Sequence, residues 1–330
     1  MTQQFEALVV NKQENDFSLT IQQLSLSDLP EGEVLIRVHY SGVNYKDSLA
    51  TIPNGNIVSS YPIVPGIDLA GVVVSSKDAR YKEGDEVIAT SYEIGVSHFG
   101  GYSEFAQIPA KWVVPLPEGL TLKEAMIIGT AGFTAALSIM RLEQNGVTPD
   151  SGNVLVTGAT GGVGSFAVSM LSKLGYSVDA STGKKSEHAY IQELGATQVL
   201  SREDVYDGTL RPLSKQKWIG AVDPVGGETL ASVLSQIKYG GSVAVSGLTA
   251  GTNLPTTVFP FILRGVNLLG IDSVNCPMET RLQVWKRLAT DFKPDHLEQL
   301  IQQEITLREL SAVLPTLLKG EARGRTIVKL

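Results

Sequence analysis

Val154-Leu-Val-Thr-Gly-Ala-Thr-Gly-Gly-Val-Gly164 is typical of an apolar strand that ends in glycines and leads into an apolar helix. Glycine permits a tight turn and lets the backbone approach a pyrophosphate, whose charge the first N–H groups of the helix then bind. We therefore predict a dinucleotide-binding loop made of Ala159, Thr160, Gly161, Gly162, Val163 and Gly164. Ala159 replaces the first glycine of the common G-x-G-x-x-G pattern, so the alternative is a glycine-rich turn of an α/β protein without a cofactor.

From about residue 121 onward, strands alternate with helices, which is typical of a doubly wound parallel sheet with helical crossovers. We expect strands at residues 153–157, 176–181, 198–200, 218–223, 242–246 and 267–272. We expect helices at residues 163–174, 186–194, 228–237, 280–290 and 307–319. Residues 125–140 form the longest apolar stretch, which is shorter than the ~18–20 residues of a membrane span and is expected to be a loop and a buried helix.

The part of the chain before residue 121 has the pattern of a β domain. Short Val-, Ile- and Leu-rich runs are separated by Pro-Gly and Glu-Gly turns, which favours a partly open β-barrel. The strands are expected at residues 6–12, 19–26, 34–43, 70–75, 85–90, 103–108 and 112–116. A last strand at 326–330 needs a partner sheet, so the C-terminal tail is expected to return to this discontinuous first domain.

Composition excludes several classes of protein. With 43% apolar and 18% charged residues, the chain is not intrinsically disordered, and 330 residues suffice for two domains. The net charge of −7 and the lack of long basic runs argue against nucleic-acid and membrane-surface partners. A single cysteine, Cys276, and an N-terminus without the pattern of a signal peptide lead us to expect a cytoplasmic protein.

The choice between the two nicotinamide dinucleotides depends on the end of the second strand of the predicted sheet. A carboxylate there would bind the adenosine ribose, but Thr182, Gly183 and Lys184 follow this strand, and Asp179 lies inside it. Hydroxyl and ammonium groups suit a 2′-phosphate, so we predict a preference for NADPH. The alternative is that the lysine is an ordinary solvated residue and that NADH is used adequately. Arg202, after the third strand, is a candidate for the adenine edge or a plain surface arginine.

Ligands of such sheets bind at the carboxyl ends of the strands. Further backbone contacts to the cofactor are therefore expected after the fourth, fifth and sixth strands, at Asp223, Ser246, Leu248 and Ser273.

No metal site is expected. Zinc needs clustered Cys, His or carboxylate ligands, and the chain has one cysteine and four histidines, none at short spacing from another. His98 lies in a glycine-rich segment and could line a cleft, whereas His39 is expected on a strand.

A polar loop directly follows the apolar strand that ends near Val43. Asn44-Tyr-Lys-Asp47 brings together an amide, a phenol, an amine and a carboxylate. The phenol is a candidate proton or hydrogen-bond donor to a carbonyl oxygen. On the residues alone, an ordinary polar loop is the favoured interpretation.

These motifs together resemble the medium-chain dehydrogenase/reductase superfamily, in its zinc-free, quinone-oxidoreductase-like branch, and within it the YhdH/YhfP group of acrylyl-CoA reductases and quinone oxidoreductases. The resemblance covers essentially the whole chain. It is carried by Asn44–Asp47, Pro65–Gly71, Gly100–Glu104, Met126–Thr134, Gly158–Gly164, Pro255–Arg264 and Gly324–Val328. Zinc-dependent relatives have Gly-His-Glu where this chain has Gly66-Ile-Asp68, and a cysteine where it has Asn44, so metal-assisted alcohol oxidation is not expected.

The resemblance implies a GroES-like catalytic domain at residues 1–122 and 274–330, a Rossmann domain at 123–273, and a homodimer. It implies NADPH-dependent hydride transfer to a short conjugated acceptor, with acryloyl-CoA as the favoured one, and no zinc. Tyr45 is then the candidate catalytic donor, with Asn44 and Asp47 orienting it or the nicotinamide ribose. Thr134 would contact the nicotinamide amide, Ile262 would pack on its ring, and Arg264 would serve CoA or the dimer.

Two other functions stay open at this point. One is the reduction of quinones or other enones, with acryloyl-CoA merely tolerated. The other is a nucleotide-sensing protein without useful catalysis, similar to the lens-crystallin relatives of the same branch.

Overall fold

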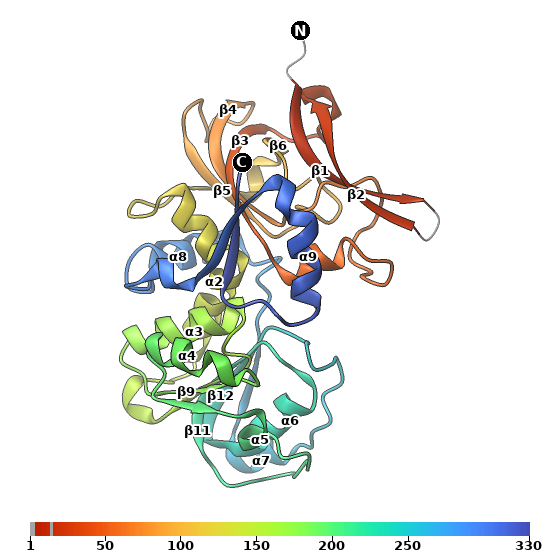
Figure 1. Ribbon diagram of the computed structural model, residues 1–330. Helices are drawn as coiled ribbons and strands as arrows, with labels where there is room; N and C mark the ends of the chain where they lie inside the picture. Colours follow the sequence, from red (N-terminus) through yellow and green to blue (C-terminus); the bar gives the residue numbers. More distant parts are fainter. Residues whose placement is uncertain (1–3, 14–15) are drawn as a thin grey trace. The chain divides into compact units, whose positions relative to one another are not determined.

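The computed structural model describes residues 4–13 and 16–330 (Figure 1). The chain forms two compact units, and each is described by itself below. The β-rich unit comprises the residues up to Thr130 together with Val274–Ala289 and Leu297–Leu330. The α/β unit comprises Ala131–Ser273 and Thr290–His296. The domain boundaries that we expect from the sequence, 122/123 and 273/274, stay a prediction.

The α/β unit is built on a six-stranded, fully parallel sheet of order β10-β9-β8-β11-β12-β13. Its strands are β8 (Val154–Val156), β9 (Val178–Ser181), β10 (Gln198–Leu200), β11 (Trp218–Asp223), β12 (Ile237–Val245) and β13 (Asn267–Gly270). Chain order reverses between β8 and β11, which makes this point the topological switch of a doubly wound sheet. The expected Rossmann architecture is thereby confirmed.

Helices cover both faces of this sheet, as right-handed crossovers on either side of the switch point require. Figure 1 shows α3 and α4 on one side of the strands and α5, α6 and α7 on the other. The helices are α3 (Gly162–Lys173), η4 (Lys185–Glu187), α4 (His188–Glu193), α5 (Arg202–Val205), α6 (Gly227–Gln236) and α7 (Phe259–Arg264), with η3 (Pro149–Ser151) before the sheet. Trp218, Leu234 and Val243 pack in the core between the sheet and its helices.

The β-rich unit contains a seven-stranded sheet and a separate hairpin. The sheet has the order β14-β15-β3-β4-β5-β7, with β6 paired to β3, and the hairpin joins β1 and β2. The strands are β1 (Gln4–Gln13), β2 (Asp16–Ser25), β3 (Val34–Gly42), β4 (Asp68–Ser76), β5 (Glu86–Thr90), β6 (Phe105–Ile108), β7 (Val113–Pro115), β14 (Ile301–Thr306) and β15 (Arg325–Lys329). On β3, Val34, Ile36 and Val38 are buried and alternate with more exposed residues, as its sequence predicts.

The C-terminal strand returns to the first part of the chain. β15 runs antiparallel to β3, where Ile327 is the partner of Gly42, and parallel to β14. The expected return of the tail is therefore confirmed. The helices of this unit are η1 (Leu26–Asp28), α1 (Tyr45–Leu49), η2 (Ala110–Trp112), α8 (Met278–Leu288), η5 (Leu297–Leu300), η6 (Leu307–Glu309) and α9 (Leu310–Leu318).

Helix α2 (Leu122–Gln144) carries the chain from one unit to the next. Gly129 has φ 50° and ψ −158°, a conformation that interrupts the helical geometry and that only glycine adopts easily. By length and composition alone α2 could cross a membrane, but 89% of its apolar window is buried inside the protein, which is equally typical of a core helix. The expectation of a buried helix in residues 125–140 is confirmed, but the expected loop is wrong, because α2 spans the whole stretch and only Gly129 departs from helical geometry.

Four short elements differ from the sequence-based expectation. Asn44–Asp47 is not a loop, because Asn44 is the N-cap of the five-residue helix α1. Helices α5 and α7 and strand β14 are absent from the expected elements. Helices of four to six residues complete fewer than two turns and a six-residue strand only three alternations, so their residues carry little signal of their own.

Candidate functional site

The glycine-rich loop of the α/β unit has the geometry of an anion-binding turn. Gly158 follows β8 with φ +55°, and Gly161 is the N-cap of α3. A Cβ atom on Gly164 would lie 2.3 Å from the carbonyl oxygen of Gly158, so the helix can approach the loop only if this residue is glycine. The expected strand, turn and helix are therefore in place.

The first turn of α3 is open to a ligand. No side chain caps it and no acidic residue lies in it. The N–H groups of Gly162, Val163 and Gly164 are among those that a helix leaves without an intrahelical partner, and no partner for them is found among the described residues. These groups and the positive end of the helix dipole suit a phosphate.

Ala159 and Thr160 connect this loop to the next strand end. The N–H of Ala159 donates to the Ser181 carbonyl oxygen (3.0 Å), so the expected cofactor contact of Ala159 does not involve its N–H group. The hydroxyl oxygen of Thr160 lies 3.4 Å from that of Thr182.

The ends of β9 and β10 lie side by side and bring the predicted adenosine-binding residues together. Gly183 is covered by the guanidinium of Arg202, because a Cβ atom on Gly183 would lie 2.6 Å from Arg202 Nε. The N–H of Lys184 donates to Thr182 Oγ1 (3.1 Å). Asp179 lies within β9, as predicted, and accepts hydrogen bonds inside the unit from Asn153 Nδ2 and Trp218 Nε1.

Asp223 joins two strand ends at the topological switch. Its carboxylate accepts hydrogen bonds from Thr157 Oγ1 (2.5 Å) and the Gly226 N–H (2.7 Å), and burial raises its pKa. Its carbonyl oxygen accepts the Ser246 N–H (3.0 Å). These contacts give Asp223 a structural role at the predicted cofactor edge.

The other predicted cofactor residues divide into a buried pair and exposed side chains. Thr134 and Ser273 lie together, with Thr134 Oγ1 donating to Ser273 Oγ (2.9 Å). Ser246 Oγ is buried, and it has no hydrogen-bond partner within the part of the chain that the structure describes. Leu248 and Ile262 are 60% and 69% exposed.

Arg264 forms hydrogen bonds within its own unit. Its guanidinium donates to the carbonyl oxygens of Ser235 (2.8 Å) and Ser214 (2.7 Å), at the end of α6 and in a neighbouring loop. The expectation that it serves CoA or the dimer stays a prediction.

In the β-rich unit, the predicted catalytic segment is the first turn of a helix. Asn44 is the N-cap of α1, and its N–H donates to Asp47 Oδ2 (2.8 Å). Tyr45 is the first helical residue, and its side chain is 44% exposed. The phenol thus stands on a helix whose N-terminus is fixed by two buried polar residues.

Asp47 is fully buried and ties α1 to the turn that precedes β4. Its Oδ1 accepts the N–H groups of Gly66 (3.2 Å) and Ile67 (2.9 Å). Burial, with a further contribution from the negative charge of Asp68, raises the pKa of Asp47 to about 6. Asp47 is thus a positioning residue rather than a group exposed to a substrate.

Asp68 is the centre of the buried polar network. Its carboxylate accepts Asn44 Nδ2 (2.8 Å) and both the N–H (2.8 Å) and the hydroxyl (2.5 Å) of Thr130. Arg325 Nη2 lies 3.7 Å from Asp68 Oδ2. This ion pair is almost fully buried, with Asp68 0% and Arg325 3% exposed.

The Arg325 guanidinium reaches several elements from β15. Nη1 donates to Asn44 Oδ1 (3.2 Å) and to the Val43 carbonyl oxygen (3.0 Å), and Nε donates to that of Ile127 (3.0 Å). Burial lowers its pKa. We did not predict Asp68, Thr130 or Arg325 as site residues, although each lies in a motif that carries the family resemblance.

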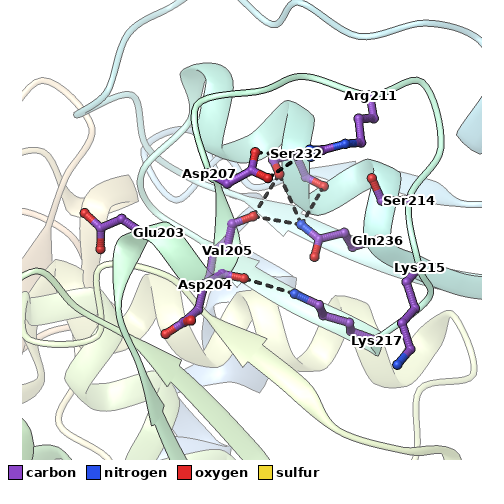
Figure 2. A pocket seen from close by; sticks show the side chains of 10 residues that line it. All are labelled: Glu203, Asp204, Val205, Asp207, Arg211, Ser214, Lys215, Lys217, Ser232 and Gln236. Atoms are coloured by element: carbon purple, nitrogen blue, oxygen red, sulfur yellow. Dashed lines mark hydrogen bonds and ion pairs between the residues drawn. The ribbon is translucent and has the colours of Figure 1, made fainter.

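The α/β unit also has a cavity of about 280 Å³, which none of the predicted cofactor residues lines (Figure 2). Lys217 and Gln236 line it and directly precede β11 and β12, whereas the predicted cofactor residues follow the strands. Its polar groups bond to one another, for example Arg211 to Asp207 (2.9 Å) and Lys217 Nζ to the Asp204 carbonyl oxygen (3.0 Å). We assign it no role in binding.

Two family models match the chain. The alcohol dehydrogenase GroES-like domain matches residues 30–118, and the zinc-binding dehydrogenase model matches residues 162–290.

Three relatives resemble the chain over nearly its whole length. YhfP of Bacillus subtilis is named as a provisional quinone oxidoreductase and is 61% identical over 100% of both chains. Its crystal structure with bound NAD has a TM-score of 0.98. The acrylyl-CoA reductase AcuI of Ruegeria pomeroyi is 52% identical over 98% of both chains. The YhdH oxidoreductase of Salmonella enterica, solved with NADP, is 46% identical, covers 98% of this chain and 99% of its own, and has a TM-score of 0.96.

The name of the second family model raises the question of zinc. Among the described residues, no three His, Cys, Asp or Glu side chains lie close enough together to hold a metal ion. Around Asp68 the neighbours are an amide, a hydroxyl and a guanidinium, and a cationic neighbour does not fit a zinc site. His98 does not help, because it packs edge-on against Trp112 with Nε2 2.7 Å from the Gln107 carbonyl oxygen.

The raised pKa of Asp47 predicts how the pH changes the stability. Asp47 binds a proton more tightly in the folded than in the unfolded state, which stabilises the folded protein at low pH. This contribution to the free energy of unfolding is complete below pH 3.8 and is lost as the pH rises through about 6. For a pKa difference of this size, the free energy of unfolding should fall by about 2–3 kcal/mol over that window. Asp47→Asn should remove this part of the pH dependence, measured by urea unfolding between pH 4 and 7.

Glu33→Gln is the matched control for that experiment, because Glu33 also accepts a backbone N–H, that of Ala110 (2.8 Å), but is exposed. Equal pH slopes for the native protein and Asp47→Asn would contradict the assignment.

Proposed function

Because the chain belongs to the medium-chain dehydrogenase/reductase family, in the group of YhfP, YhdH and AcuI, we propose that this oxidoreductase is an NADPH-dependent reductase of short enoyl thioesters such as acryloyl-CoA. The observation that carries the choice of substrate is the 52% identity to an acrylyl-CoA reductase over 98% of both chains. The exposed phenol of Tyr45, on a helix held by buried carboxylates, supports it.

The α/β unit offers the groups that a nicotinamide dinucleotide requires. The open N–H groups of Gly162, Val163 and Gly164 suit the pyrophosphate. Thr182, Lys184 and Arg202 lie at the ends of β9 and β10, where the N–H of Lys184 donates to Thr182 Oγ1 and the Arg202 guanidinium covers Gly183. This polarity favours the 2′-phosphate of NADPH, and relatives have been solved both with NADP and with NAD.

The chemistry divides between cofactor and chain. When bound, the reduced nicotinamide supplies the hydride for the β-carbon of the enoyl thioester. Negative charge then develops on the thioester oxygen, to which we assign the Tyr45 O–H as hydrogen-bond donor, and a proton from water at the α-carbon would complete the saturated thioester. Asn44 and Asp47 act behind Tyr45, because the first caps its helix and the second joins that helix to the Gly66–Ile67 turn.

A second candidate function is the reduction of quinones, which the name and the 61% identity of YhfP support. It needs the same cofactor residues and the same donor at a carbonyl oxygen. A protein that senses the nucleotide without turnover is the third outcome, and it would bind NADPH without consuming it.

The phenol of Tyr45 should be needed for turnover but not for binding of NADPH. Tyr45→Phe removes one donor to the developing oxyanion, so kcat with acryloyl-CoA should fall by ~10²-fold. The assay follows NADPH oxidation at 340 nm with acryloyl-CoA, crotonyl-CoA and 1,4-benzoquinone as separate acceptors. Tyr239→Phe, which changes another exposed tyrosine, should leave kcat unchanged.

The acceptors decide between the candidate functions. Fast turnover of benzoquinone with little of either thioester would replace the proposed function by quinone reduction. Saturable NADPH binding without turnover of any acceptor would support a sensor. An unaltered kcat in Tyr45→Phe would remove the role assigned to the phenol.

The charges beside Gly183 should select the cofactor. Replacing Lys184 and Arg202 by Ala should raise KM for NADPH about 10-fold or more and leave KM for NADH within about twofold, because only NADPH carries the phosphate. Lys173→Ala, at the surface of the same unit, is the control. An equal change in the KM values for NADPH and NADH would show that these residues do not bind the 2′-phosphate selectively.

We also propose a cytoplasmic homodimer. The single cysteine supports the location, and an exposed apolar face supports the assembly: Val258, Phe259, Ile262 and Leu263 are 43–69% exposed on and beside α7. Strand β13 is the edge of the same unit's sheet. Leu263→Glu should therefore give monomers in analytical ultracentrifugation, whereas Leu282→Glu, an exposed leucine of the β-rich unit, should not. A monomeric native protein would contradict this assembly.

A further inference from the structure

Two consecutive residues at the end of β5 have a backbone conformation that side chains disfavour. Ser91 has φ 64° and Tyr92 has φ 50°, in the left-handed region that glycine normally occupies. Such residues persist only where their surroundings hold them, and they are frequent at functional sites. None of the sequence motifs includes these two residues, Ser91 and Tyr92, which we call the Ser91–Tyr92 corner.

The surroundings of the corner are rigid on several sides. The N–H of Ser91 donates to the Ile67 carbonyl oxygen (2.8 Å), next to the turn that Asp47 holds. The ring of Tyr92 stacks on Trp112 at 5.8 Å between centroids, and the Arg281 guanidinium lies 4.4 Å from its centre. The strained conformation is therefore imposed by packing.

The corner directs the Ser91 hydroxyl to Thr130. Their oxygens are 3.0 Å apart, and Thr130 Oγ1 donates its own proton to Asp68 Oδ1. Ser91 must therefore be the donor of the first bond, and the order Ser91, Thr130, Asp68 has a fixed direction. Such a chain polarises each bond in the same sense and fixes the orientation of its last acceptor.

The orientation of Asp68 in turn decides that of Asn44. Asp68 Oδ2 accepts Asn44 Nδ2, while Asn44 Oδ1 accepts from Arg325, so the amide cannot flip without losing both bonds. Asn44 is the N-cap of α1, on which Tyr45 stands. We propose that Ser91 and Thr130 are positioning residues: their hydroxyls hold Asp68 and Asn44 in the one arrangement that fixes the first turn of α1 and Tyr45.

This inference rests on the proposed function for its effect on turnover, but its structural part is independent of the acceptor. Ser41 provides the comparison, because its buried hydroxyl also bonds to Asp68, at the carbonyl oxygen (2.6 Å) and not at the carboxylate. If the carboxylate contacts matter, removing the Ser41 hydroxyl should not disturb α1.

The test uses Thr130→Val, Thr130→Ser, Ser91→Ala, the double variant Ser91→Ala/Thr130→Val, and Ser41→Ala as control. Hydrogen–deuterium exchange of a peptide that spans α1 is measured for each. We expect about 10-fold faster exchange in Thr130→Val, native exchange in Thr130→Ser and in Ser41→Ala, and an intermediate rate in Ser91→Ala.

Turnover of acryloyl-CoA gives the second readout. We expect kcat to fall about 10-fold in Thr130→Val and about 3-fold in Ser91→Ala, with KM for NADPH unchanged. Because Ser91 acts through Thr130, the double variant should match Thr130→Val and not show the product of the two effects.

The outcomes separate the two proposals. Native exchange of α1 in Thr130→Val, equal loosening in Ser41→Ala, or multiplicative effects in the double variant would overturn the positioning role. If the native protein reduced no acceptor while α1 still loosened in Thr130→Val alone, the proposed function would fail and the positioning of α1 would stand.

Discussion

The buried ion pair of Asp68 and Arg325 is the constraint on which the β-rich unit depends. Removing two charges from water costs several kcal/mol for each, and their attraction offsets this cost only when further hydrogen bonds satisfy both groups. The 3.7 Å separation is too long to do so alone, so neighbouring elements supply the remaining partners. Asn44 follows β3, Thr130 comes from α2, and the carbonyl oxygens of Val43 and Ile127 accept from Arg325 Nη1 and Nε, whereas Arg325 Nη2 has no hydrogen-bond partner among the described residues. Four separate parts of the chain must therefore meet at one point.

The same ion pair explains two glycines that would otherwise seem unrelated. A Cβ atom on Gly42 or on Gly129 would lie 2.7 Å from Arg325 Nη2, so the guanidinium fits only between two residues without side chains. Gly129 also has the positive φ that interrupts α2 and brings the Thr130 N–H to Asp68. The kink of α2 is thus a consequence of satisfying a buried carboxylate. It also places the candidate donor, because Asn44, whose amide bonds to both Asp68 and Arg325, is the N-cap residue of the helix of Tyr45 and bonds to Asp47 through its backbone N–H.

The α/β unit follows a simpler rule, in which local backbone geometry makes the site. A short strand, a left-handed Gly158 and a close approach at Gly164 leave helix N–H groups open, and these need no side chain to bind an anion. Asp223 stabilises the neighbouring strand end by accepting from Thr157 and Gly226. In this unit the candidate pyrophosphate site is therefore made by backbone groups, whereas in the β-rich unit buried side chains fix the candidate donor.

The sequence by itself determined those features of the fold that depend on residues close to one another along the chain. The glycine loop, the alternation of strands and helices, the place of Asp179 inside β9 and the return of the last strand followed from local patterns and from the need of a strand for a partner. Only the tertiary structure decided that Asp68 meets Arg325, that Arg264 is used inside its own unit, and that Ser91 faces Thr130. Those contacts join residues 29 to 257 positions apart, and no local periodicity encodes which distant polar groups must share a buried charge.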